Sequence, residues 1–270
     1  MFLWRVIVII IWVPVILFIT VYGDTLHFAL MTIAFITFGI IEYTDLFKAK
    51  GKIPNVYVAI LGSMTISILM YLYDSTIALY ILVFIFLASL VWGILRGRTS
   101  GYIFVTSVTL NGIFYVGFLL GHLILIRKMV GGQWIVTLLF LTIWILDVAC
   151  YLMGKGFGRK KIAPEISPQK TREGAISGIV IGTAIFTLGS YLIPGIEIKS
   201  LVVRVIIGII ISVAGILGDL VESAMKRDAG VKDSGKILPG HGGVLDRFDS
   251  MIFAAPTLYY LLMLFEWLGC

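Results

Sequence analysis

The chain has 270 residues, of which 60% are hydrophobic and only 13% are charged. This composition excludes an ordinary soluble globular protein and indicates an integral membrane protein. The formal net charge of +6 lies in short basic segments without interleaved aromatic residues, so it is typical of loops facing an anionic leaflet and does not indicate a nucleic-acid partner.

The apolar runs predict an all-α polytopic fold with about nine transmembrane helices, because each run is close to the roughly 20 residues that a spanning helix needs. The run at 101–126 contains several glycines and His122, so a kinked or partly re-entrant segment is an alternative there, with His122 satisfied at a helix end. We expect the helices at residues 4–22, 25–47, 55–73, 75–95, 101–126, 133–153, 175–194, 201–222 and 250–268.

Lysine and arginine residues predict the orientation in the membrane. They gather in alternate loops, at 48–54, 96–100, 154–174 and 223–247, which nine helices place on one side. The positive-inside rule makes that side cytoplasmic, in a plasma or inner membrane. We expect residues 1–126 to form a lipid-facing scaffold, and residues 127–270 to carry the active site on two cytoplasmic polar loops.

Residues 147–174 form the first polar segment. Asp147 lies inside an apolar run, where a carboxylate is costly, so it either pairs with a basic side chain of another helix or has a function. The glycines that follow predict a flexible joint or a phosphate cradle, and Arg159 is the best candidate for a lipid phosphate among basic residues that also mark topology. These glycines are Gly154, Gly156 and Gly158.

Further along the same segment, Ser167 and Pro168 precede Lys170. Serine followed by proline predicts the start of a helix, where backbone N–H groups and the helix dipole favour anions. We therefore expect Lys170 to lie at an anion-binding helix end.

Residues 219–249 form the second polar segment and hold six of the fifteen acidic residues of the chain. If the preceding helix continues past Asp219, then Asp219, Ser223 and Lys226 share one face. The glycines after Pro239 can turn backbone N–H groups toward an anion. Carboxylates beside basic side chains suit a magnesium-bridged polyphosphate, the alternative being a solvated loop between two helices.

Both segments resemble the phosphatidate cytidylyltransferases, also called CDP-diacylglycerol synthases. Two departures stand out: Cys150 replaces an alanine before Tyr151, and Arg172 stands where the family commonly has an aromatic residue. The matching residues are Ser167, Pro168, Lys170, Thr171, Glu173 and Gly174, then Ser223, Lys226, Arg227, Lys232, Asp233, Pro239, His241, Gly242, Gly243, Asp246, Arg247 and Asp249.

The resemblance implies that CTP and phosphatidic acid are joined into CDP-diacylglycerol with release of pyrophosphate. We expect Mg²⁺, and a second cation, at the metal-binding residues Asp219, Asp246 and Asp249. The expected catalytic residues are Asp219, Asp246, Lys226, Arg227, Arg247 and His241. The expected substrate-binding residues are Asp147, Arg159, Ser167, Lys170, Arg172, Glu173, Ser223, Lys232, Asp233, Gly242 and Gly243.

Two other functions stay open at this point. A CTP-dependent lipid-alcohol kinase also needs a metal, a nucleotide and a polar loop near the membrane. An ion-coupled transporter would use Asp147 and Asp219 as ion sites, but transporters scatter such residues and show repeated halves. The concentration of polar residues in two loops on one side favours an enzyme that acts in the bilayer, and a symmetric homodimer is the common default.

Overall fold

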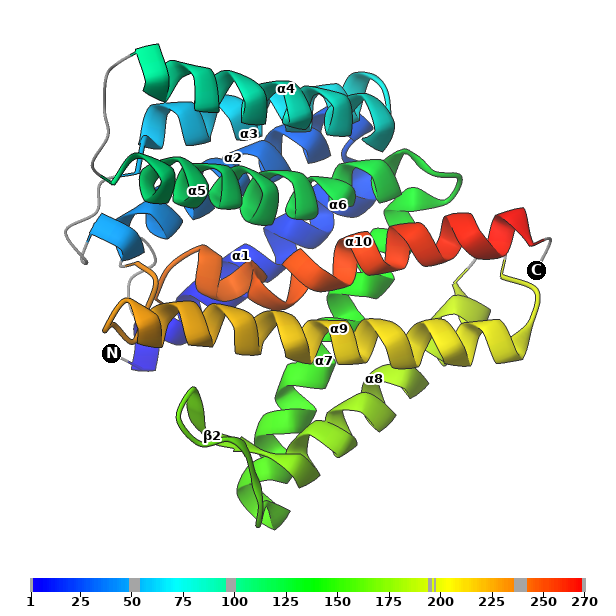
Figure 1. Cartoon of the computed structure of the whole chain (residues 1–270). Helices are drawn as coiled ribbons and strands as arrows, with labels where there is room; N and C mark the ends of the chain where they lie inside the picture. The colour runs from blue at the N-terminus through cyan, green and yellow to red at the C-terminus, as the bar shows by residue number, and fades with distance from the viewer. Residues whose placement is uncertain are drawn as a thin grey trace. The chain divides into compact units, whose positions relative to one another are not determined.

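The chain is helical almost throughout (Figure 1). A computed structural model describes residues 2–48, 54–95, 101–193, 196, 198–235 and 242–268. Within these residues, seven helices are long and apolar enough to cross a membrane, and two shorter apolar helices, Ile11–Tyr22 and Val56–Leu72, accompany them. The prediction of an all-α polytopic membrane protein is therefore confirmed.

The chain forms two compact units, each taken in turn below. The first comprises Met1–Leu125 and Asp228–Arg247, and the second comprises Ile126–Arg227 and Phe248–Cys270. The first unit contains α1 (Phe2–Tyr22), α2 (Thr25–Lys48), α3 (Val56–Leu72), α4 (Ser75–Leu95), α5 (Tyr102–Gly112), the π-helical turn η1 (Ile113–Phe118) and most of α6 (Leu119–Lys128). The second contains α7 (Gly132–Phe157), β1 (Lys161–Ala163), β2 (Ser167–Thr171), α8 (Arg172–Leu192), α9 (Leu201–Asp228) and most of α10 (Leu245–Trp267).

Short polar side chains mark several helix starts. Asp24 Oδ1 accepts a hydrogen bond from the His27 backbone N–H at 2.8 Å, just before α2. Asn55 caps α3 in the same way, with its side chain accepting from the backbone N–H of Val58 at 3.3 Å. Such caps satisfy N–H groups that have no partner within the first turn of a helix. These capping side chains therefore mark where a new helix begins after the preceding apolar run.

The segment at 101–126 is one helical run with a π-helical turn, η1, in its middle. The run is a candidate span of 27 residues, Tyr102–Lys128, in place of a partly re-entrant segment. At Gly117 a Cβ would come within 2.6 Å of Ser63 Oγ on α3, so close packing explains the glycine. His122 is buried, and its Nδ1 lies 2.9 Å from the carbonyl oxygen of Phe118, as expected for a satisfied histidine.

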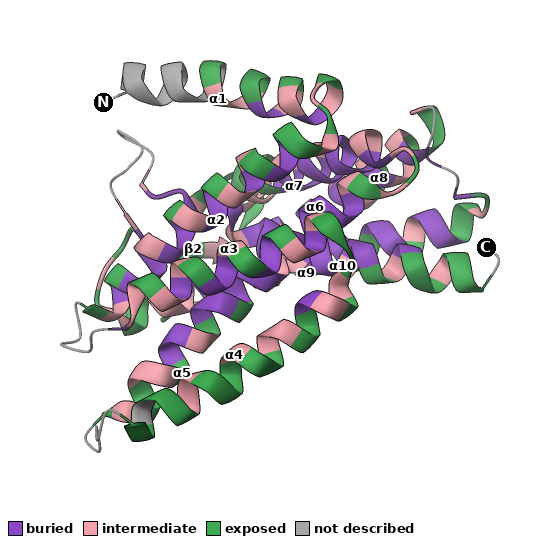
Figure 2. Cartoon of the chain, turned by 90° about the horizontal axis from the view of Figure 1, so that it is seen from above, coloured by how far each residue is buried: buried purple, intermediate pink, exposed green. Residues whose placement is uncertain are grey.

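In the first unit, most of α4 is exposed or intermediate in burial (Figure 2), and many of its exposed residues are large and apolar. Phe84 is 66% exposed and Ile94 is 75% exposed. An exposed apolar helix is costly in water and favourable against lipid. We therefore assign the outer face of α4 to the bilayer.

In the second unit, α7 and α8 pack closely through glycines of α8. A Cβ at Gly174 would lie 2.6 Å from the carbonyl oxygen of Cys150, and one at Gly178 would overlap the Cys150 sulfur. Small residues at every fourth position let membrane helices approach closely. This packing fixes the ends of α7 and α8, between which the first polar segment lies.

Candidate functional site

The two polar segments of the sequence meet in the second unit. The ammonium group of Lys170, on β2, lies 2.5 Å from Asp219 Oδ2, on α9. Arg227 lies further along α9 than Asp219, and its Nε donates a hydrogen bond to the carbonyl oxygen of Ile166 at 3.2 Å. Residues 49 and 61 positions apart in the chain are therefore joined by an ion pair and by a charge-assisted hydrogen bond, respectively.

Helix α9 continues to Asp228, so the predicted common face exists beyond Asp219. The hydroxyl of Ser223 donates to Asp219 Oδ1 at 3.3 Å. Lys226, however, forms an ion pair with Glu222, whose side chain is completely buried. Glu222 was not among the predicted site residues. An acidic residue four positions before a lysine commonly forms an ion pair with it along a helix, and this spacing was visible in the sequence.

Asp249 lies beside the same group of charges. A Cβ at Gly218 would come within 2.5 Å of the Asp249 carbonyl oxygen, so this glycine lets α9 approach α10 at the turn that carries Asp219. The half-buried carboxylate of Asp249 is repelled by those of Asp219, Glu222 and Asp147. Four carboxylates from α7, α9 and α10 therefore share one region of the second unit.

The segment before α8 differs from its predicted form. Ser167–Thr171 is strand β2, which pairs with β1 through Lys161 with Thr171 and Ala163 with Ser167. The helix begins only at Arg172, after Thr171, whose hydroxyl accepts from the Gly174 N–H at 3.2 Å. The predicted helix start at Ser167 is wrong, because the threonine cap and the hairpin determine where the helix begins.

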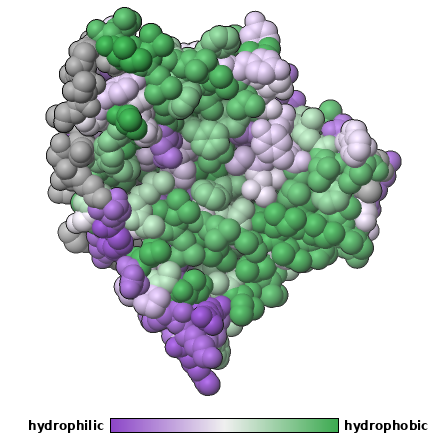
Figure 3. Space-filling view, in the orientation of Figure 1, coloured by the Kyte–Doolittle hydropathy of each residue, from purple (hydrophilic) through white to green (hydrophobic). Residues whose placement is uncertain are grey.

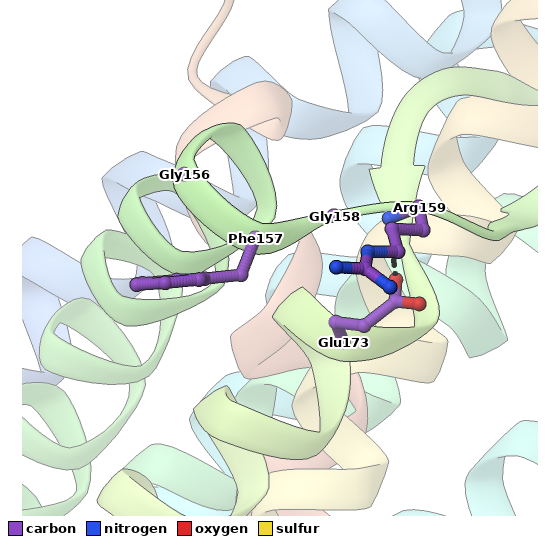
Figure 4. Close-up of a pocket in the computed structure, with 5 residues that line it drawn as sticks. All are labelled: Gly156, Phe157, Gly158, Arg159 and Glu173. Carbon is purple, nitrogen blue, oxygen red and sulfur yellow. Dashed lines mark hydrogen bonds between the residues drawn. The ribbon is translucent and has the colours of Figure 1, made fainter.

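Glu173 ties the end of α7 to the start of α8. Its carboxylate accepts the backbone N–H of Arg159 at 3.0 Å and that of Lys160 at 3.2 Å. Figure 4 shows the Arg159 side chain beside Glu173, facing a pocket. The pocket has a volume of about 440 Å³ and is lined by Gly156, Phe157, Gly158, Arg159 and Glu173.

The three glycines of this region do not form the predicted phosphate cradle. Gly154 and Gly156 lie inside α7, where their N–H groups belong to the helical ladder. Gly158 ends the helix, and its N–H donates to the carbonyl oxygen of Gly154 at 3.1 Å. An anion at this end would therefore be held by basic side chains and not by these backbone groups.

Basic residues make the end of α7 and the hairpin strongly hydrophilic, next to a broad apolar surface (Figure 3). Phe157 is 68% exposed within this region. An aromatic ring beside exposed cations is typical of a membrane–water interface. The exposed cations here are Lys155, Arg159, Lys160, Lys161 and Arg172.

The rest of the second polar segment belongs to the first unit. Asp246 Oδ2 accepts from the backbone N–H of Ser234 at 3.1 Å, its hydroxyl at 2.9 Å and the Gly243 N–H at 2.7 Å. The Gly243 N–H is therefore committed to Asp246, and its predicted contact with phosphate is absent from this conformation. Gly242 adopts a φ of 79°, in the left-handed region that favours glycine.

The remaining predicted residues of this segment are either exposed or outside the described residues. Lys232, Asp233 and Arg247 have exposed side chains in the first unit. His241, like Pro239, lies outside the residues that the structure describes.

Glu42, also in this unit, was not among the predicted site residues. Glu42 on α2 is only 2% exposed, and its carboxylate contacts the start of α10. A carboxylate inside the apolar run 25–47 was the signal that could have found it.

The donor chemistry of the second unit fits magnesium. Within each unit, and among the described residues, no three His, Cys, Asp or Glu side chains converge as a complete metal-binding group. Mg²⁺ is commonly held by one or two carboxylates together with phosphate oxygens and water. Asp219 and Asp249 can supply those carboxylates, and a cation between them would relieve the repulsion described above.

Comparison with known proteins finds a matching family and several similar relatives. The model of the family described as "Cytidylyltransferase family" matches residues 3–265. A phosphatidate cytidylyltransferase of Bacillus subtilis is 42% identical over 196 residues, which are 72% of this chain and 71% of that protein. One from Synechocystis is 35% identical over 258 residues, covering 84% and 85% of the two chains. One from Staphylococcus saprophyticus is 44% identical over 154 residues, covering 57% and 58%.

Proposed function

The chain belongs to the cytidylyltransferase family, and from this premise we propose that it joins CTP and phosphatidic acid into CDP-diacylglycerol and pyrophosphate. The observation that carries the proposal is the ion pair between Lys170 and Asp219, 2.5 Å apart. Lys170 belongs to the first motif that resembles the phosphatidate cytidylyltransferases, and Asp219 lies four residues before Ser223, where the second motif begins. Their contact supports the proposal that both motifs contribute to one site, as a single nucleotidyl-transfer centre requires.

The chemistry needs no strong base. A phosphate monoester has a second pKa of about 6, so phosphatidic acid is mostly dianionic at neutral pH. One of its phosphate oxygens attacks the α-phosphorus of CTP, a new P–O bond forms, and the bond to the bridging oxygen of the β-phosphate breaks. The electron pair of that bond leaves with pyrophosphate. Catalysis therefore consists of bringing two anions together and neutralising their charge.

Basic side chains would perform that neutralisation. Lys170 on the hairpin contacts α9, and Arg227 on α9 contacts the hairpin. Both side chains can bind phosphate oxygens. Lys226 is anchored by Glu222, which fixes its position on the inner side of α9. Lys232 and Arg247, in the first unit, are exposed, and each is proposed to contact a substrate phosphate.

Magnesium is proposed as the cofactor, held by Asp219 and Asp249. When bound, Mg²⁺ would stabilise the negative charge of the leaving pyrophosphate. Asp219 is already oriented for such a role by Ser223 and Lys170. Lys170 would then exchange its carboxylate partner for a phosphate oxygen, so the ion pair keeps both groups in place before substrate binds.

The lipid phosphate is proposed to enter past Arg159. The pocket that Arg159 lines is also lined by Phe157, and it lies next to the cationic hairpin. A membrane-embedded substrate needs an apolar path for its acyl chains and a cation for its headgroup, and this end of α7 provides both.

The activity is tested with the purified full chain in lipid nanodiscs. We expect pyrophosphate and a cytidine-bearing lipid to appear with CTP, phosphatidic acid and Mg²⁺, and neither product with ATP, GTP or UTP. Diacylglycerol in place of phosphatidic acid is the control for a lipid kinase, which would release CDP instead of pyrophosphate. Release of CDP, or no nucleotide turnover with any lipid, would overturn the proposal.

The cytoplasmic position of the site gives a separate prediction. In a chain carrying Cys150→Ala and Cys270→Ser, single cysteines at Lys160 and Lys232 should react with a membrane-impermeant maleimide only from the cytoplasmic side. A cysteine at Lys199, in the connection between α8 and α9, should react only from the opposite side and is the matched control. Labelling of Lys160→Cys or Lys232→Cys in intact cells would contradict the proposed orientation.

A further inference from the structure

Glu42 is a buried carboxylate in an otherwise apolar part of the first unit. It lies on α2 and is 2% exposed, among residues such as Ile40 and Tyr43 that are also buried. A buried polar group lowers stability unless its hydrogen bonds are satisfied, and a buried charge does so more strongly. The partners of Glu42 therefore indicate what the residue is for.

Those partners are the first groups of α10. Glu42 Oε1 accepts the backbone N–H of Val244 at 3.0 Å, and Oε2 accepts that of Leu245 at 2.8 Å. These N–H groups have no acceptor within the helix, and the positive end of the helix dipole favours a negative charge there. The cap of α10 thus comes from a residue about two hundred positions earlier in the chain.

A second carboxylate is connected to the first through one hydroxyl. Ser234 Oγ lies 3.4 Å from Glu42 Oε2 and 2.9 Å from Asp246 Oδ2. Asp246 also accepts the Gly243 N–H at 2.7 Å. Glu42 and Asp246 therefore hold the same stretch of backbone from two sides, with Ser234 between them.

Two glycines make room for this arrangement. A Cβ at Gly235 would overlap Glu42 Oε1, and a Cβ at Gly243 would overlap both Glu42 Oε2 and Ser234 Oγ. Any larger residue at either position would displace the carboxylate. The backbone here is therefore shaped around Glu42.

We propose that Glu42 is a positioning residue for the reaction: it fixes the start of α10, and through Ser234 the orientation of Asp246. This inference rests on the proposed function, for which Asp246 is an expected catalytic residue. Glu42 itself contacts no substrate. A carboxylate is required because each of its two oxygens accepts a backbone N–H, from Val244 and from Leu245, whereas a glutamine at this position would turn an NH₂ group toward one of these donors.

The test compares Glu42→Gln with Thr32→Val. Thr32 lies on the same helix and is 1% exposed, but its hydroxyl donates only to the Phe28 carbonyl of its own helix, at 2.9 Å. In the full chain in nanodiscs, hydrogen exchange should rise about tenfold in peptides covering residues 232–248 of Glu42→Gln, because hydrogen bonds to a charged acceptor are lost. Exchange in α3 and α5 should not change, and Thr32→Val should behave like the wild type in residues 232–248.

Kinetics separate positioning from a general loss of structure. For Glu42→Gln, kcat should fall by about 10²-fold, the cost of misplacing a reacting group by about an ångström, while KM for phosphatidic acid stays within about threefold. Glu42→Asp keeps the charge on a shorter side chain and should recover part of kcat. If Glu42→Gln does not fold, Ser234→Ala carries the test, with the same regional rise in exchange at a smaller amplitude.

Each result decides the inference. Unchanged exchange in residues 232–248, or a uniform rise over the whole chain, would overturn it, and so would a wild-type kcat in Glu42→Gln. If the wild-type protein forms no cytidine-bearing lipid, the proposed function fails, while the exchange measurement still shows whether Glu42 holds the start of α10.

Discussion

Replacing Asp219 with asparagine is expected to leave the protein folded and to reduce its turnover by at least about 10³-fold, since removal of a single electrostatic contributor often costs 10²–10³. Asparagine has almost the same shape, so it can still accept the Ser223 hydrogen bond. It cannot provide the negative charge that pairs with Lys170 and is proposed to bind Mg²⁺. The measurement is the rate of pyrophosphate release against magnesium concentration.

Asp228→Asn is the matched control, because Asp228 is an exposed aspartate and the last residue of the same helix. It should retain wild-type turnover. Asp249→Asn is expected to be milder than Asp219→Asn if Asp249 serves a second cation. If turnover of Asp219→Asn depends on magnesium as that of the wild type does, Asp219 holds no metal and the proposed mechanism fails.

Asp246→Asn should also abolish turnover, but its interpretation needs a second measurement. Asp246 Oδ2 accepts three hydrogen bonds that hold the loop around Ser234 and Gly243. The variant should therefore show faster hydrogen exchange in this loop as well as lost activity. Asp219 lacks this structural role, which makes it the cleaner test of the metal.

The helices were largely predictable from the sequence because a bilayer demands long apolar runs. The residues at which the helices end were less predictable. Helix α9 was expected to end near residue 222, yet it continues to Asp228 because charged residues form a helical ladder as readily as apolar ones where they face water. Helix α7 continues through Gly154 and Gly156 to Phe157, since a glycine weakens a helix without ending it.

The site was predictable where it rests on motifs. Lys170 and Asp219 were both expected in it, and the family resemblance drawn from their segments is confirmed. Their ion pair could not be predicted, because nothing in a sequence shows which lysine of several meets which aspartate. Lys226 illustrates this. Helical spacing predicted it on the same face as Asp219, but it forms an ion pair with Glu222, which is nearer along the helix.

Glu42 shows a different limit. Its hydrogen bonds join α2 to residues 234–245, and a single sequence carries no record of contacts over such a separation. The rule that drew attention to Asp147, a carboxylate within an apolar run, applied equally to Glu42. The first 126 residues were interpreted as scaffold because of their composition, so this one acidic residue was not weighed by itself.

Lys170→Ala is expected to reduce turnover by about 10²- to 10³-fold, because Lys170 pairs with Asp219 on α9 and is proposed to hold a CTP phosphate. Lys170→Arg should recover little, since a planar guanidinium cannot replace a compact ammonium at so short a distance. Lys199→Ala, which removes an exposed lysine in the connection between α8 and α9, should have no effect. Wild-type turnover in Lys170→Ala would remove the hairpin from the site.

The double variant Lys170→Ala with Asp219→Asn tests whether the two residues act together. Groups that act as one unit are strongly non-additive, so the double variant should be about as slow as Asp219→Asn alone. The physical reason is that the lysine then has no carboxylate to orient it, and its removal changes nothing further. If the two losses multiply instead, each residue contributes independently, and the ion pair that joins the two motifs has no part in catalysis.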